Sequence, residues 1–182
     1  PAMSGGLAVT SLVGQNLGAD RDDRVRDSVR WSLLLTVGIT ATLSLIVLAV
    51  PDRLVAIFTK DVRVIAVGID YLRFAALSYV PYACMFALSG VLRGAGDTVT
   101  AMLMTLTSLW GVRVPLAAVL SRLPRFGIKG VWMALVAGPI AGSILNYAYY
   151  KTGRWKRRVV VHHAMPVTSE HSEPNETQDH PN

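Results

Sequence analysis

The chain has 182 residues, of which 52% are hydrophobic and only 16% are charged, and its net charge is +6. A soluble domain carries roughly 25% charged residues, and here the apolar residues come in blocks long enough to cross a bilayer. Composition therefore excludes an ordinary soluble domain and predicts an all-α integral membrane protein. Because the cations form no continuous basic face, we expect them in cytoplasmic loops of a membrane protein and expect no nucleic-acid partner.

Five apolar segments predict membrane spans, and the segments between them carry the charge. The spans cover about 1–17, 32–50, 65–92, 99–120 and 131–150. Because a span needs about 20 residues and the chain begins with Pro1, we expect a truncated first span and a fragment of a longer protein. Residues 20–30 are too charged for hydrocarbon and predict an interfacial linker. The membrane bundle would cover 1–158, followed by a disordered cytoplasmic tail at 159–182.

Polar residues end the first span, at Gln15, Asn16 and Gly18. We expect Gly18 to cap the helix in the left-handed conformation, which glycine adopts without strain. The second span ends at Pro51, and residues 54–64 predict a short amphipathic turn on the opposite side of the membrane.

The third span, 65–92, is the longest and carries a polar stripe on an otherwise apolar helix. At about 100° per residue, five members fall within a narrow arc: Tyr71, Ser78, Tyr82, Met85 and Ser89. Methionine repacks readily and tyrosine offers a π face to cations, so the stripe suits a cavity for cationic or aromatic compounds. Packing against neighbouring helices explains the same residues equally well. Pro81 lies inside this span and predicts a kink.

A glycine-rich turn joins the third span to the fourth through Arg93, Gly94, Gly96 and Asp97. The glycines permit a tight turn. Arg93 and Asp97 flank it and could latch a cytoplasmic gate. The alternative is that they only end the helices and orient them by charge.

The fourth span, 99–120, carries a weaker stripe of Thr100, Met104, Thr107 and Gly111. It is weaker because hydroxyl groups also bond to the preceding helical turn. Arg113 and Pro115 follow late in the span. A charge inside a membrane segment is costly and often functional, but an arginine near a helix end can reach the interface. We therefore interpret Arg113 as a structural gate or a lipid-facing anchor.

The fifth span, 131–150, has small residues four apart at Ala134, Gly138 and Gly142, a spacing that lets helices approach closely. An aromatic belt follows, made of Tyr147, Tyr149, Tyr150 and Trp155. Ten Lys and Arg residues lie on this side of the predicted bundle and six on the other. The positive-inside rule therefore predicts a cytoplasmic C-terminus.

The remaining reactive residues predict no site. Asp70 and Arg73, three apart on one helix face, predict a local ion pair. Cys84 is the single cysteine and predicts packing. The histidines lie at irregular spacing in the tail (His162, His163, His171 and His180), so we expect no metal, and no motif indicates a cofactor.

Five landmarks in chain order resemble the MATE (multidrug and toxic compound extrusion) family. They are Leu12–Ala19, Leu92–Thr98, Leu109–Leu116, Gly127–Trp132 and Gly153–Lys156, and they extend over nearly the whole chain up to Lys156. The resemblance implies an antiporter coupled to protons or sodium, with two six-helix lobes. This chain would be the C-terminal lobe from its second helix onward. A cytoplasmic C-terminus is also implied, in agreement with the charge count.

One departure from the family bears on the coupling ion. The sodium-coupled branch has a carboxylate inside the helix before the Arg-Gly turn, and the corresponding position here is near Tyr82. No Asp or Glu lies between Tyr71 and Gly96. The resemblance therefore favours H⁺ over Na⁺, with the coupling acid expected in the N-terminal lobe.

We expect a secondary antiporter of the cell (plasma or inner) membrane that exports small organic, often cationic, compounds by alternating access. Its partners would be a small-molecule substrate, the lipid bilayer and the missing N-terminal lobe of the same protein. Two alternatives stay open: a non-transporting assembly subunit or orphan half-lobe, and an exporter of a lipid-linked substrate. We do not expect an enzyme, because membrane-embedded catalysis would need clustered acids or histidines at the bilayer edge.

Overall fold

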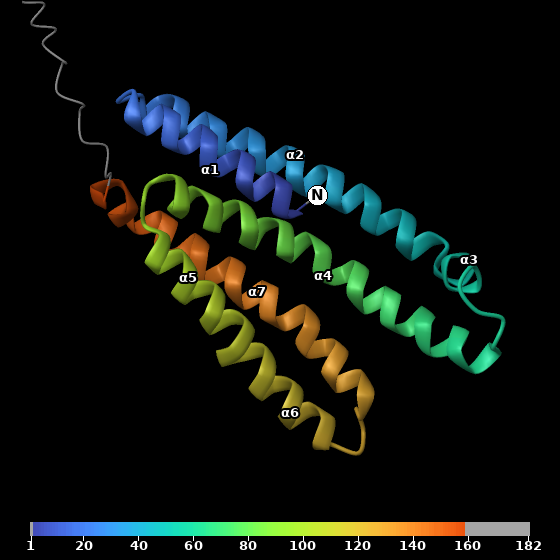
Figure 1. Cartoon of the computed structure of the whole chain (residues 1–182). Coiled ribbons are helices and arrows are strands. Elements are labelled where there is room, and N and C mark those ends of the chain that lie inside the picture. The colour runs from blue at the N-terminus through green and yellow to red at the C-terminus, as the bar shows by residue number, and fades with distance from the viewer. Residues whose placement is uncertain (1, 159–182) are drawn as a thin grey trace, which may run out of the picture.

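The computed structural model describes residues 2–158, which are helical without any strand (Figure 1). The helices are α1 (Ala2–Gly18), α2 (Asp22–Ala49), α3 (Pro51–Ala56), α4 (Val62–Gly94), α5 (Thr98–Leu106), α6 (Val114–Arg122) and α7 (Ile128–Thr152), with a π-helical segment η1 (Thr107–Arg113) and a 3-10 helix η2 (Arg154–Arg158). Four stretches of the described chain are long and apolar enough to cross a membrane: Asp22–Ala49, Val62–Gly94, Thr98–Arg122 and Ile128–Thr152. The predicted all-α membrane bundle is confirmed. The predictions for 159–182, histidines included, lie outside the described residues.

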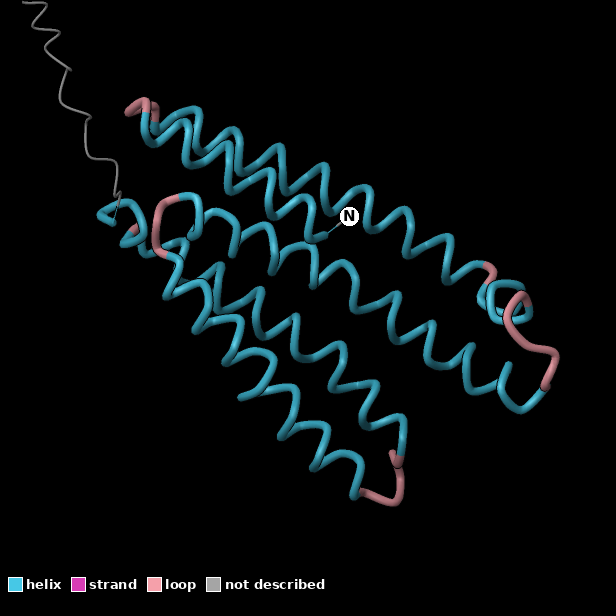
Figure 2. The backbone as a smooth tube through the Cα atoms, in the orientation of Figure 1, coloured by secondary structure: helices cyan, strands magenta, loops and turns pink. Residues whose placement is uncertain are grey.

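Helix α4 lies in the middle of the bundle. Helices α1 and α2 pack along one side of it and α7 along the other, with the α5–α6 stretch beside α7 (Figure 1). The chain runs up and down, so one end of the bundle collects the α1–α2 connection, the α4–α5 turn and the end of α7 (Figure 2). The opposite end collects α3 and the α6–α7 turn. We call the first of these the turn end.

Local sequence signals set where the helices begin and end. Asp61 caps α4, because its side chain accepts a hydrogen bond of 2.8 Å from the backbone N–H of Arg63. Pro51 begins α3, where its missing N–H is not needed. Gly153 ends α7 with a φ of 67°, a left-handed conformation that favours glycine.

Helices α1 and α4 approach each other most closely at Gly6 and Gly90, where there is no room for a side chain. A Cβ added to Gly90 would overlap the carbonyl oxygen of Gly6. Thr10 uses the same close approach, and its hydroxyl donates to the carbonyl of Gly6 at 2.9 Å and to that of Gly90 at 3.1 Å. Backbone-to-backbone packing through small residues is how membrane helices associate without a hydrophobic driving force.

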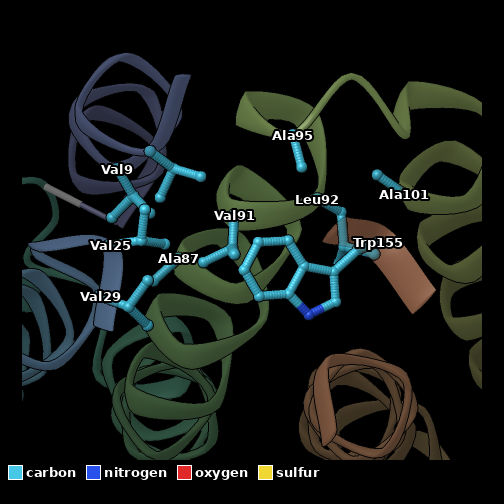
Figure 3. Packing of buried hydrophobic residues seen from close by; sticks show 10 residues of the cluster. Val9, Val25, Val29, Ala87, Val91, Leu92, Ala95, Ala101 and Trp155 are labelled. Carbon is cyan, nitrogen blue, oxygen red and sulfur yellow. The ribbon is translucent and has the colours of Figure 1, made fainter. Parts of the chain in front are cut away.

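A buried apolar cluster fills the turn end of the bundle (Figure 3). Its members come from five helices and from the α4–α5 turn: Val9, Val13, Val25, Val29, Ala87, Val91, Leu92, Ala95, Ala101 and Trp155. Trp155 lies beside Val91 and Leu92, is 2% exposed and stacks on Tyr150 with ring centroids 5.4 Å apart. We expected Trp155 in an aromatic belt at the membrane interface. It is instead buried, because η2 folds it back under α4 and α5.

Two further details differ from the sequence prediction. Residues 20–30 form no separate element, since α2 begins at Asp22 and runs on into the apolar segment. The left-handed residue after α1 is Asp20, with a φ of 58°, and Gly18 still belongs to the helix, so the capping role predicted for Gly18 is wrong. Aspartate tolerates this conformation better than most residues, and the N–H of Arg21 then closes the end on the carbonyl of Asn16 at 2.9 Å.

The membrane-spanning stretch Thr98–Arg122 contains the π-helical segment η1, which the sequence did not predict. Pro115 offers no N–H to the turn before it, and its ring collides with the carbonyl four residues earlier. A wider π turn accommodates both effects. By contrast, α4 runs from Val62 to Gly94 without interruption at Pro81, where Ser143 of α7 donates to the Pro81 carbonyl at 2.8 Å.

Replacing Gly90 with Ala will destabilise the protein, because the methyl group must push α1 away from α4. We expect a cost of about 1–3 kcal/mol, typical of overpacking. Gly38→Ala is the matched control, since nothing lies within 4 Å of a Cβ at Gly38. That change should be neutral or stabilise by up to about 1 kcal/mol. Thermal unfolding of the complete detergent-solubilised protein, followed by size-exclusion fluorescence, measures both. Equal melting temperatures for the two variants would contradict this packing.

Candidate functional site

Asp97 is the polar centre of the turn end. It is 1% exposed, although it follows directly on the tight turn after α4. Its Oδ1 accepts from the Thr100 hydroxyl at 2.6 Å, and its Oδ2 accepts from the Tyr149 phenol at 2.6 Å. Hydrogen bonds to a carboxylate are stronger than neutral ones. The turn between α4 and α5 is therefore tied to the last turns of α7, 52 residues away in sequence.

The two glycines of this turn have different roles. Gly96 has a φ of 85°, so the tight turn requires glycine there. Gly94 is the last residue of α4, and a Cβ there would crowd Thr10 and Val13 of α1. Gly94 thus permits the contact between helices rather than the turn itself.

A groove of about 310 Å³ opens between α4 and α5, next to the turn. Its lining is mostly apolar and aromatic: Phe86, Ser89, Arg93, Thr98, Ala101, Met102, Thr105, Leu106, Leu109 and Trp110. The Nε of Arg93 is buried and has no hydrogen-bond partner in residues 2–158. A small apolar groove with one cation and a few hydroxyls has the composition and size of a ligand pocket.

The stripe predicted on the third span is divided between several surroundings. Ser89 lines the groove. Met85 is fully buried against Gly142 of α7 and Ser108 of η1, and Ser78 donates to the carbonyl of Ala75 within its own helix. Tyr71 lines a second hollow of about 530 Å³ with Trp132, at the opposite end of the bundle. The stripe therefore does not form one continuous cavity wall within the described chain.

The stripe predicted on the fourth span is also divided. Thr100 binds Asp97, Met104 is half-buried and Thr107 is exposed at the start of η1. The groove is lined instead by other residues of this stretch, namely Thr98, Ala101, Met102, Thr105, Leu106, Leu109 and Trp110. Pro115 is exposed near the start of α6.

Arg113, at the end of η1, makes a hydrogen bond to α4. Its Nη1 donates to the Tyr82 hydroxyl at 3.1 Å, and its aliphatic stem lies over Gly138 of α7. Tyr82 in turn stacks on Phe86 of the groove, with ring centroids 6.0 Å apart. Two residues predicted separately, Tyr82 and Arg113, are thus in contact.

The ion pair predicted between Asp70 and Arg73 is wrong. Asp70 pairs with Lys129 at the start of α7, with Nζ 3.0 Å from Oδ2, and Arg73 is exposed. A partner at the start of the neighbouring helix thus replaces the one predicted on the same helix. This pair joins α4 to α7 at the end opposite Asp97.

The polar residues at the end of α1 act locally. Asn16 donates to Ser28 of α2 at 3.2 Å and so joins these two helices, whereas Gln15 is exposed. Both lie away from the groove.

Several functional candidates were missed because their partners are distant in sequence. The sequence predicted Tyr149 only as a member of the aromatic belt. Ser108, fully buried, donates to the Gly138 carbonyl at 2.6 Å, and Asn146, also fully buried, leaves Oδ1 without a partner among the described residues. Ser108 fell outside the stripe chosen on its helix. Within residues 2–158, no three potential metal ligands come together.

The fold is that of a MATE transporter lobe. The crystal structure of the eukaryotic MATE transporter AtDTX14 matches 87% of this chain, with a TM-score of 0.78 and 22% sequence identity, and 35% of that transporter is covered. The MatE family model matches residues 1–119. The chain belongs to the MatE family, as its motifs predicted. Because the family consists of transporters, its membership also confirms that the chain is not an enzyme.

Curated relatives carry names that refer to drug resistance. The chain is 29% identical over 161 residues to the probable multidrug resistance protein NorM of Thermotoga maritima, covering 88% of this chain and 35% of NorM. It is 31% identical over 144 residues to the multidrug resistance protein PmpM of Pseudomonas aeruginosa, covering 77% of this chain and 30% of PmpM. The chain thus spans about a third of the length of the curated relatives it matches.

Replacing Tyr149 with Phe removes the phenol donor from Asp97 and keeps the ring. We expect a loss of about 1.5–3 kcal/mol, the range for a hydrogen bond to a charged group. Tyr147→Phe is the control, because Tyr147 is 51% exposed on the same helix and should change stability by less than about 0.5 kcal/mol. Denaturation of the complete protein in detergent measures the difference. Equal stability of the two variants would show that the Asp97–Tyr149 bond does not hold the turn.

Proposed function

We propose that this chain is the C-terminal part of a secondary antiporter that exports small organic, often cationic, compounds in exchange for H⁺ by alternating access. The observation that carries the proposal is the family match over residues 1–119, together with relatives named as multidrug resistance proteins. The chain carries out no chemistry on its substrate. It supplies one wall of a path whose access changes as the helices move.

The groove supports a small, partly aromatic substrate. Its volume of about 310 Å³ and its Phe86, Met102 and Trp110 lining suit a ring-containing compound of drug size. We assign Ser89 and Tyr82 to the neighbourhood of this substrate. A lipid-linked substrate would need a wider and more basic groove, whereas the only cation in this lining is Arg93.

The preference for H⁺ over Na⁺ rests on the charges around Tyr82. The resemblance places the sodium-branch carboxylate near Tyr82, and here a guanidinium donates to the phenol at 3.1 Å. A fixed positive charge at hydrogen-bond distance repels a second cation strongly in a low-dielectric interior. The coupling acid is then expected outside this chain.

The partner proposed for this lobe is the N-terminal lobe of the same protein, in line with the one-third coverage of its relatives. The turn end is the proposed cytoplasmic side, since Arg24, Arg93 and Lys156 are among the cations gathered there. The membrane would be the plasma or inner membrane of the cell. An assembly subunit that does not transport remains the alternative. That reading requires the chain to insert and fold without a second lobe.

Everted membrane vesicles that contain the complete protein test the transport proposal. With the pH inside made lower than the pH outside, we expect uptake of a fluorescent organic cation such as ethidium into the vesicles. The same vesicles with more Na⁺ inside than outside, and no pH difference, should take up ethidium only at the background rate.

Vesicles without the protein are the control for leak. Uptake driven as strongly by Na⁺ alone would contradict H⁺ coupling. Absence of uptake under either gradient, with protein shown to be folded and inserted, would favour the assembly subunit.

A further inference from the structure

The Arg113–Tyr82 pair places unused hydrogen-bond donors inside the membrane-spanning part of the bundle. Tyr82 lies 12 residues before the end of α4, or about 18 Å along the helix, and Arg113 lies nine residues before the end of α6, or about 13 Å. Both positions fall well inside a hydrocarbon layer of about 30 Å. A guanidinium at this depth is costly unless an anion accompanies it.

The described chain supplies no such anion. No carboxylate in residues 2–158 is paired with Arg113, and the acid of α4, Asp70, pairs with Lys129. Among the described residues, the guanidinium has its hydrogen bond with the phenol of Tyr82. Because the phenol oxygen accepts this bond, its own hydrogen stays available as a donor.

The guanidinium is also held in place. Its stem lies over Gly138, where an added Cβ would sit 3.0 Å from Cβ of Arg113. The residue is half-buried and belongs to η1, the π-helical segment. An arginine extended toward the lipid headgroups would not need the space that the missing side chain of Gly138 leaves on α7. The glycine and the phenol hold the head group within the bundle instead.

We propose that Arg113 and Tyr82 form a binding site for a carboxylate group. The planar fork of a guanidinium matches the two oxygens of a carboxylate, and the phenol adds a third donor. One guanidinium neutralises one negative charge, so a monoanionic carboxylate fits better than a dianionic phosphate. The carboxylate comes either from a bound aromatic acid or zwitterion, or from another segment of the complete protein.

The groove favours the bound compound. Phe86 stacks on Tyr82 and also lines the groove, so a ring in the groove and a carboxylate at Arg113 would lie next to each other. This source of the carboxylate rests on the proposed transport function. Binding, however, is measured without a gradient, so failure of the site and failure of transport are distinguishable.

The test uses the complete protein in phosphatidylcholine nanodiscs, with 1-naphthoate and its neutral isostere 1-naphthamide as probes in calorimetric titrations. We expect naphthoate to bind at least about tenfold more tightly than naphthamide, because hydrogen bonds to a charged group are stronger than those to a neutral one. Arg113→Gln should reduce the ratio to near one, and Tyr82→Phe should reduce it several-fold while keeping the ring stack. Arg113→Lys retains the charge without the fork and should give an intermediate ratio. Arg122→Gln, an exposed arginine late in the same membrane helix, is the control.

A carboxylate from the protein itself gives a different pattern. The wild type would then show no preference for naphthoate, Arg113→Gln would lower the melting temperature well below that of Arg122→Gln, and neutralising one acid elsewhere in the protein would restore it. The proposal is overturned if the wild type shows no preference and Arg113→Gln melts at the same temperature as Arg122→Gln.

Discussion

The close approach of α1 to α4 is the constraint on which the rest of the bundle depends. Gly6 and Gly90 have no side chains, so the two backbones meet directly, and Thr10 bonds to carbonyls on both helices. This contact places α4 at the centre, where α7 packs on it through Met85 and Gly142. The groove and the Arg113–Tyr82 pair both lie on parts of the α4 surface that α1 does not cover.

Among the polar contacts of α4 and the turn after it, three pairs that involve a charged side chain reach neighbouring elements at different depths. At the turn end, Asp97 accepts a hydrogen bond from Tyr149, and in the middle Tyr82 accepts one from Arg113. At the opposite end, Asp70 forms an ion pair with Lys129. Under the proposed alternating access, each connection would join elements that move, or stay fixed, together. Hydrogen bonds and ion pairs are strong in a low-dielectric interior, and each of these contacts is either formed or broken as a whole. They would therefore suit the two arrangements that the proposed function requires.

The sequence predicted the helices well and their polar contacts poorly. Long apolar blocks and the Arg93–Asp97 turn have strong local signals, so most helix ends lie within a few residues of the prediction, whereas α2 begins at Asp22, ten residues before the predicted span. Tyr149 and Arg113 bind partners 52 and 31 residues away, and no periodicity marks such a pair. Trp155 is buried because η2 folds back, and membrane aromatics at a helix end normally predict the interface. Gly94 was assigned to the turn, although its role is to admit α1.

The central claim is that the groove between α4 and α5 belongs to an alternating-access path. The direct measurement is the labelling of a Thr105→Cys variant, with Cys84 replaced by Ser, by a membrane-impermeant maleimide added to one side of oriented vesicles of the complete protein. Thr105 lines the groove. The account predicts labelling from either side, with substrate shifting the ratio between the two. Labelling only by a lipid-soluble maleimide, unchanged by substrate, would mean that the groove faces lipid and would contradict the account.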